Sequence, residues 1–133
     1  MIADLLRDTL SALYETGSFR FVGMDCGQLE QERPSVKFPC ALVALRSVEV
    51  SETSSRLEID EGTLSVRVAW TYNLSGNHDE VIQGYELIEH VRKALCRRLL
   101  GQGYLHLRGI ERTSDLFNGT EIWTLTYRFS GHW

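Results

Sequence analysis

Three cysteines and four histidines are the residues best suited to chemistry in this sequence. In chain order they are Cys26, Cys40, His78, His90, Cys96, His106 and His132. No two of them stand at a spacing typical of metal ligands, such as Cys-x-x-Cys or His-x-x-x-His. His90 and Cys96 are six positions apart, so they do not share one face of a helix. The sequence therefore predicts no metal site and no cofactor.

A cysteine nucleophile activated by a histidine stays open, because the side chains of such a pair meet only in space. Cys40 and Cys96 lie within apolar stretches, which favours inert thiols in the core. Cys26, between Asp25 and Gly27, is the thiol that we expect to be exposed. An odd number of widely spaced cysteines is typical of reduced thiols in a cytosolic protein.

Serine, glycine and carboxylate patterns indicate structure rather than catalysis. No serine stands in a Gly-x-Ser-x-Gly elbow. Gly101-Gln102-Gly103 follows a helical pattern, so we expect it to end that helix and not to cradle a phosphate. The acidic pairs Asp60-Glu61 and Asp79-Glu80 are typical of a turn and a helix start, where both are exposed. No catalytic residue is assigned, and we expect a protein that is not an enzyme.

Length and charge narrow the class of protein. A chain of 133 residues fits a single domain, 1–133. The sequence has 14 basic and 18 acidic side chains, a net charge of -4, which argues against general affinity for nucleic acid. No apolar run is long enough to cross a membrane, and the first residues lack the pattern of a signal peptide.

The first part of the chain predicts a helix, a short strand and a long connection. Residues 2–15 form the expected amphipathic helix, with Gly17 just past its end. A short strand at 19–24 leads into an irregular polar connection over 25–39 that contains both prolines. Connections of this length in small domains are often functional. The helix has an apolar stripe of Ile2, Leu5, Leu6, Leu10, Leu13 and Tyr14.

The middle of the chain predicts strands. Residues 40–50 are expected to form a central strand, because their first half is apolar on both faces. Residues 51–55 predict a polar hairpin tip, and the chain returns through 57–60. Glu61-Gly62 then predicts a turn into 63–72, whose strict alternation is the strongest strand signal here.

A long helix is predicted next. Asn77 can cap it with Glu80 as the reciprocal partner, and Gly101 and Gly103 supply the stop. About 21 residues would give a helix of about 30 Å. Its expected buried stripe contains Val81, Tyr85, Ile88, Val91, Leu95 and Leu99.

A C-terminal hairpin completes the expected fold. Its arms are 104–112 and 120–129, and Asn118-Gly119 is a strong turn signal between them. The order α-β-β-β-α-β-β predicts an α+β domain: an antiparallel or mixed β-sheet packed against an N-terminal helix and one long central helix. The second arm places Trp123, Leu125, Tyr127 and Phe129 on one face.

With no chemistry assigned, function is expected at the surface. Arg46, Arg67 and Arg128 are predicted to project from the sheet face opposite the helices. Serines and threonines between them make this face polar, which fits either a solvated face or a subunit interface. Trp133 can either dock a partner or fold back on the domain. The candidate interface contains Arg46, Ser51, Thr53, Arg56, Arg67, Arg128 and Trp133.

The order and texture of these elements resemble the tail terminator and tail completion proteins of long-tailed bacteriophages and prophages. The likeness begins with an N-terminal helix, a short strand, and Phe-Pro ahead of a buried strand in Lys37-Phe38-Pro39-Cys40-Ala41-Leu42-Val43. It continues with a hairpin, one long helix and a closing hairpin around Leu116-Phe117-Asn118-Gly119-Thr120-Glu121-Ile122-Trp123.

The resemblance implies a structural role in virion assembly. Members of the family form hexameric rings that terminate the tail tube and join it to the head connector. The implied partners are copies of the chain itself, tail-tube proteins and head-connector proteins, with no membrane. DNA passes through such a ring without sequence-specific binding. The implied location is the bacterial cytoplasm during assembly and the virion of an active phage, and 51–61 would contact neighbouring subunits or the tube.

Two other classes of function stay open. A small α+β binding or regulatory module, in the form of a dimer with an unknown ligand, would use a sheet edge. An enzyme would need residues that converge only in space, in a pocket with a perturbed cysteine or histidine.

Overall fold

Two helices and five strands follow one another in the order expected for an α+β domain. The computed structural model describes residues 2–31, 34–53, 56–72, 78–101, 103–113 and 119–132. The elements are α1 (Ile2–Glu15), β1 (Phe21–Met24), a short 3-10 helix η1 (Gln28–Glu30), β2 (Cys40–Thr53), β3 (Arg56–Thr71), α2 (His78–Leu95), β4 (His106–Arg112) and β5 (Thr120–His132). The predicted order α-β-β-β-α-β-β is confirmed.

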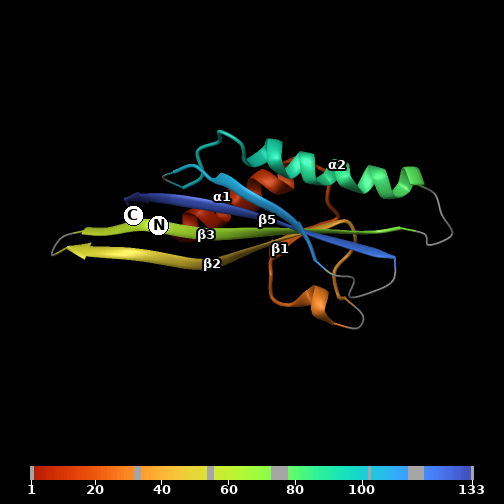
Figure 1. The fold of residues 1–133 in the computed structure, drawn as a ribbon, viewed down its shortest axis with the longest axis horizontal. Coiled ribbons are helices and arrows are strands. Elements are labelled where there is room, and N and C mark those ends of the chain that lie inside the picture. The colour runs from red at the N-terminus through yellow and green to blue at the C-terminus, as the bar shows by residue number, and fades with distance from the viewer. Residues whose placement is uncertain are drawn as a thin grey trace.

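All five strands form one mixed sheet in the spatial order β1-β2-β3-β5-β4 (Figure 1). β1 runs parallel to β2, and the other three strand pairs are antiparallel. β1 pairs with β2 only from Cys40 to Val43. Beyond that point β2 and β3 continue as a long hairpin, which projects past the part of the sheet that the helices cover (Figure 1). Residues 47–61 of this hairpin are called the arm below.

The turn predicted at Glu61-Gly62 is wrong, because β3 runs through these residues as one strand. The register against β5 shifts between Ile59 and Gly62, so the chain forms a β-bulge there. A Cβ atom on Gly62 would lie 2.2 Å from the ring of Phe129, so the glycine permits close packing. Glycine suits a bulge as well as a turn, and the local sequence does not separate the two.

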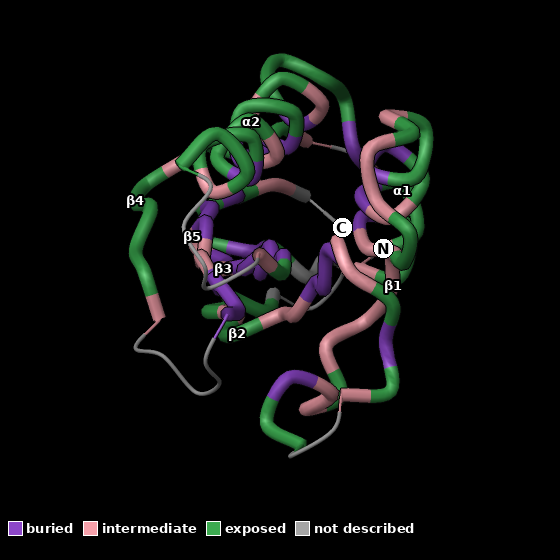
Figure 2. Tube along the Cα trace, turned by 90° about the vertical axis from the view of Figure 1, so that its right-hand side faces the viewer, coloured by how far each residue is buried: buried purple, intermediate pink, exposed green. Residues whose placement is uncertain are grey.

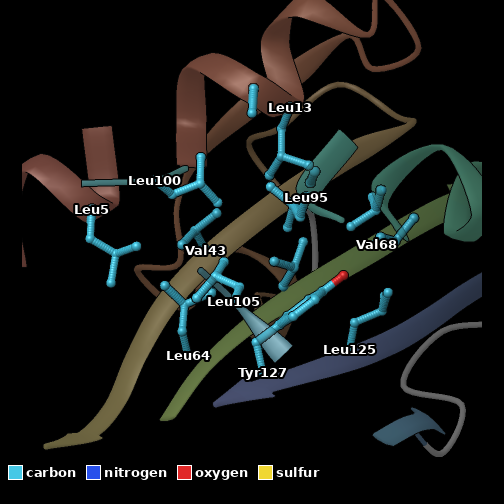
Figure 3. Close-up of a cluster of buried hydrophobic side chains, with 14 of the residues drawn as sticks. Leu5, Leu13, Val43, Leu64, Val68, Leu95, Leu100, Leu105, Leu125 and Tyr127 are labelled. Carbon is cyan, nitrogen blue, oxygen red and sulfur yellow. The ribbon is translucent and has the colours of Figure 1, made fainter. Parts of the chain in front are cut away.

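Both helices lie on one face of the sheet and bury the main core against it (Figure 3). The predicted alternation of β5 is confirmed, since Leu125, Tyr127 and Phe129 all belong to this core. Figure 2 shows the buried residues concentrated where the helices and the strands face one another. The helices contribute Leu5, Ala12, Leu13, Ile88, Val91 and Leu95, and the strands opposite them contribute Ala41, Val43, Leu64, Val66, Val68 and Trp70.

Two residues of the predicted helix stripes point outward. Tyr14 is 76% exposed, and Leu99 is 59% exposed because α2 ends at Leu95. α2 therefore has 18 residues, fewer than predicted. Arg97, two positions after its last residue, has a φ of 53°, which is outside the helical range. The predicted cap Asn77 lies outside the described residues. In the described part of the chain, neither helix is both long and apolar enough to span a membrane.

α2 approaches the sheet closely where Gly84 faces Trp70. A Cβ atom on Gly84 would lie 1.9 Å from Nε1 of Trp70. Trp70 also contacts Tyr85 edge to face, with ring centroids 5.3 Å apart. The missing side chain at Gly84 therefore sets the distance between α2 and the sheet.

The segment between β1 and β2 crosses the other face of the sheet and builds a second, smaller core. Leu29 and Val36 of this segment are buried against the sheet. The first half of β2 is thus covered on both faces, as its apolar sequence predicts. The sheet residues in this second core are Cys40, Leu42, Ala69 and Ile122.

We predict that Gly84→Ala lowers the free energy of unfolding by about 1–3 kcal/mol, because the added methyl group overlaps the Trp70 indole. Urea unfolding followed by circular dichroism measures the change. Gly109→Ala is the matched control, since a Cβ atom there has no heavy atom within 4 Å. Its effect should stay within about 0.5 kcal/mol. Equal stabilities of the two variants would contradict the close contact between α2 and the sheet.

Candidate interaction surface

The cysteines differ in their access to solvent. Burial raises the pKa of the Cys40 thiol to about 12, so this thiol is inert at neutral pH. Cys26 is exposed, as predicted. Cys96 is also exposed, which corrects its predicted place in the core, because α2 ends one residue before it.

Among the described histidines, His106 lines the same groove as Cys96, which is described below. Nδ1 of His90 lies 2.9 Å from Oγ of Ser18. Within the described ranges, no group of three Cys, His, Asp or Glu side chains has the arrangement of a metal site.

The three arginines predicted on the face opposite the helices all lie on that face, and two of them are exposed. Nε of Arg46 donates a hydrogen bond to Oγ of Ser65 at 3.0 Å. Nε of Arg128 lies 2.9 Å from the carboxylate of Glu61. The predicted polar, open face therefore exists around Arg46 and Arg128.

Arg67 is not an open interface residue, which corrects the prediction for it. Its side chain is only 8% exposed and lies beneath the segment that links β1 to β2. Nε and Nη2 donate to the Asp25 carboxylate at 2.7 and 3.2 Å. Nη1 and Nη2 donate to the Glu30 carboxylate at 2.5 and 3.0 Å. One guanidinium thus holds two carboxylates, each through two hydrogen bonds.

This ion-pair cluster ties the covering segment to the sheet. The Asp25 side chain is 7% exposed, so its charge depends on Arg67 for compensation. Hydrogen bonds from Arg67 lower the pKa of Glu30, which keeps that carboxylate ionised at neutral pH. The two partners precede Arg67 by 42 and 37 positions, so no spacing rule links them. The sequence feature that indicated a special role for Arg67 is that it is the single charged residue in the alternating stretch 63–72.

The remaining predicted interface residues belong to the arm or lie outside the described chain. Ser51 is exposed, and its hydroxyl donates to the Asp60 carboxylate at 2.5 Å. Thr53 and Arg56 form the last register pair of the β2–β3 hairpin. Trp133 lies outside the described residues. The structure therefore brings Ser51, Thr53 and Arg56 together at one end of the sheet.

A groove that the sequence did not reveal lies between the end of α2 and the start of β4. Its volume is 740 Å³, and its lining contains Cys96, Arg97, Tyr104, Leu105, His106, Leu107 and Arg108. Arg97 has a left-handed backbone conformation that glycine usually supplies at a helix end. β4 is an edge strand of the sheet, and Figure 2 shows it exposed at the margin of the molecule. The groove and this strand form a second candidate surface.

A buried carboxylate is another feature that the sequence did not reveal. Glu121 is 5% exposed and accepts hydrogen bonds from Arg112 at 2.8 Å and from the Tyr85 hydroxyl at 3.4 Å. Tyr85 contacts Trp70 and Trp123 edge to face, with centroid distances of 5.3 and 5.5 Å. Because the charge is compensated within the chain, we assign this cluster a structural role under α2.

Comparison with protein-family models and with curated protein sequences gives no match. Comparison with solved structures gives a chain from the virion of a native gene transfer agent (GTA) particle. The superposition has a TM-score of 0.60 at 11% sequence identity, and it covers 99% of this chain and 97% of that chain. At this identity the likeness establishes a shared fold along the whole chain.

We predict that Arg67→Met lowers the free energy of unfolding by about 3–5 kcal/mol, because it leaves the Asp25 carboxylate buried without a partner. Arg128→Met is the matched control on the same face, where the ion pair with Glu61 is half exposed. Its loss should be about 0–1 kcal/mol. Urea unfolding compares the two variants. A loss for Arg67→Met no larger than the control would show that the cluster does not hold the covering segment.

Proposed function

We propose that this chain is a structural subunit of a phage-like virion that forms a ring, terminates the tail tube and joins it to the head connector. The observation that carries the proposal is the likeness in fold to a chain of a gene transfer agent virion, over nearly the full length of both chains. The resemblance in element order to tail terminators supports a place at the end of the tail.

A subunit of this kind works through surfaces and not through an active site. Identical subunits close into a ring when two different surfaces of each copy fit one another around a rotation axis. In this proposal the arm and the groove beside β4 are the two surfaces, since β2 and β4 lie toward opposite edges of the sheet. In this proposal the chain catalyses no reaction and needs no cofactor. Its partners are copies of itself, the tail tube and the head connector, and DNA passes through the ring without sequence-specific binding.

The mass of the protein in solution tests this proposal. We would measure light scattering over a concentration series and image any large species by negative-stain electron microscopy. Closed rings of about six copies are expected, because the tail terminators that the chain resembles form hexamers and two different surfaces close into a ring when the rotation between copies closes. A strict dimer at every concentration would overturn the proposal and favour a small binding module.

A monomer leads to a second measurement with tail tubes present. Purified phage-like tail tubes would be mixed with the chain and imaged. The proposal expects a ring of density at one tube end and an arrest of tube growth. Bare ends and continued growth would overturn it.

A further inference from the structure

The sheet has two open edges. β4 pairs with β5 on one side, and no described strand pairs with its other side. β2 pairs with β1 only as far as Val43, so no described strand covers its outer side from Ala44 onward. Open edges present backbone N–H and C=O groups that can pair with another chain.

The two edges carry opposite charge. The arm, 47–61, contains five carboxylates and one arginine, whereas 97–108 contains three arginines, a histidine and no carboxylate. Glu49 and Glu52 are exposed on the arm and form no ion pair with any described residue. Arg97 and Arg108 line the groove and are likewise without an ion-pair partner in the described chain. The two surfaces therefore carry charges of opposite sign.

Both surfaces also expose apolar area. Val50 is 51% exposed on the arm. Leu99 and Tyr104 are 59% and 49% exposed at the end of α2 and beside the groove. Exposed apolar residues surrounded by charges are typical of contact surfaces between proteins.

Arg97 adds an independent argument. Arg97 has a φ of 53°, a left-handed conformation that is strained for any residue with a side chain and that glycine adopts without strain at many helix ends. Strained positions are common at functional sites, and this one lines the groove.

We propose that the arm of one copy docks on the β4 edge and the adjoining groove of the next copy, with Glu49 and Glu52 facing Arg97 and Arg108. The inference rests on the proposed ring and names the surfaces that form its contact. A second copy is the partner that fits, because both complementary surfaces belong to the same chain. Two arms would repel each other, as would two groove surfaces, so the charges favour a contact between an arm and a groove over a contact between like surfaces.

Charge-reversed variants test the contact. The arm variant carries Glu49→Lys and Glu52→Lys, and the edge variant carries Arg97→Glu and Arg108→Glu. Each variant alone should associate at least about tenfold more weakly than the original chain, because like charges then meet across the contact. The equimolar mixture should associate again, since each variant then presents the charge that the other lacks. Arg20→Glu with Lys93→Glu is the control for the edge variant, because both side chains are exposed outside the groove and the net charge changes by the same amount and sign.

The variant Arg97→Gly is expected to change folding stability and association in opposite directions, so it distinguishes the two effects. The glycine relieves the left-handed strain, so the folding equilibrium constant should rise about fivefold. Association should nevertheless weaken, because a groove arginine is lost. A variant that is more stable and assembles as well as the original chain would contradict the role of Arg97 in the contact.

Thiol labelling gives a readout without any substitution. Cys96 lines the groove and Cys26 lies in the segment between β1 and β2, and both are exposed in the single chain. Assembly should slow the labelling of Cys96 several-fold more than that of Cys26. Equal protection of the two thiols would count against the proposed contact.

The outcomes separate this inference from the proposed function. Rings whose charge-reversed variants fail to recover on mixing would overturn the contact between arm and groove and leave the ring itself in place. A chain that stays monomeric alone is tested on tail tubes, where a ring that each charge-reversed variant still forms by itself would overturn the contact, and bare tube ends with the original chain would overturn the proposed function.

Discussion

The buried guanidinium of Arg67 decides how the sheet is divided between core and open surface. Its hydrogen bonds to Asp25 and Glu30 hold the segment that links β1 to β2 against the face opposite the helices. Under this segment the sheet is buried on both faces, as at Leu42. Beyond it, around Arg128, the same face is open. The ion-pair cluster, together with the small apolar core around Leu29, thus fixes which part of this sheet face is covered.

The arm keeps a strand conformation despite a concentration of negative charge. Glu49 and Glu61 stand directly opposite each other in the β2–β3 register, which is unfavourable for like charges. The ion pair between Glu61 and Arg128 of β5 offsets part of this repulsion. The register of this hairpin shifts at two places, between Leu45 and Ser47 and between Glu49 and Val50, which interrupts the regular strand pairing. Because of its negative charge, the arm of one copy repels the arm of another copy and is attracted to a basic surface.

Most of the fold was predictable because it depends on patterns within single elements. The bounds of α1, the faces of β5 and the double burial of early β2 follow from apolar periodicity and were predicted. The predictions were wrong where the same local sequence is compatible with two different structures. Glu61-Gly62 suits a turn or a bulge, and Leu99 continues a helical period although the helix has already ended. For Glu61-Gly62 the deciding partner is the ring of Phe129 against Gly62, which is distant in sequence.

The sequence by itself determined the elements, their order and the apolar face of each, because periods of two and of 3.6 residues depend only on near neighbours. It also identified arginines on the second sheet face. Only the tertiary structure decided that Arg67 is buried while Arg128 is open, and that a basic groove forms beside β4. Those outcomes depend on residues dozens of positions apart, brought together by strand order and by the path of the connecting segment, which no local pattern encodes.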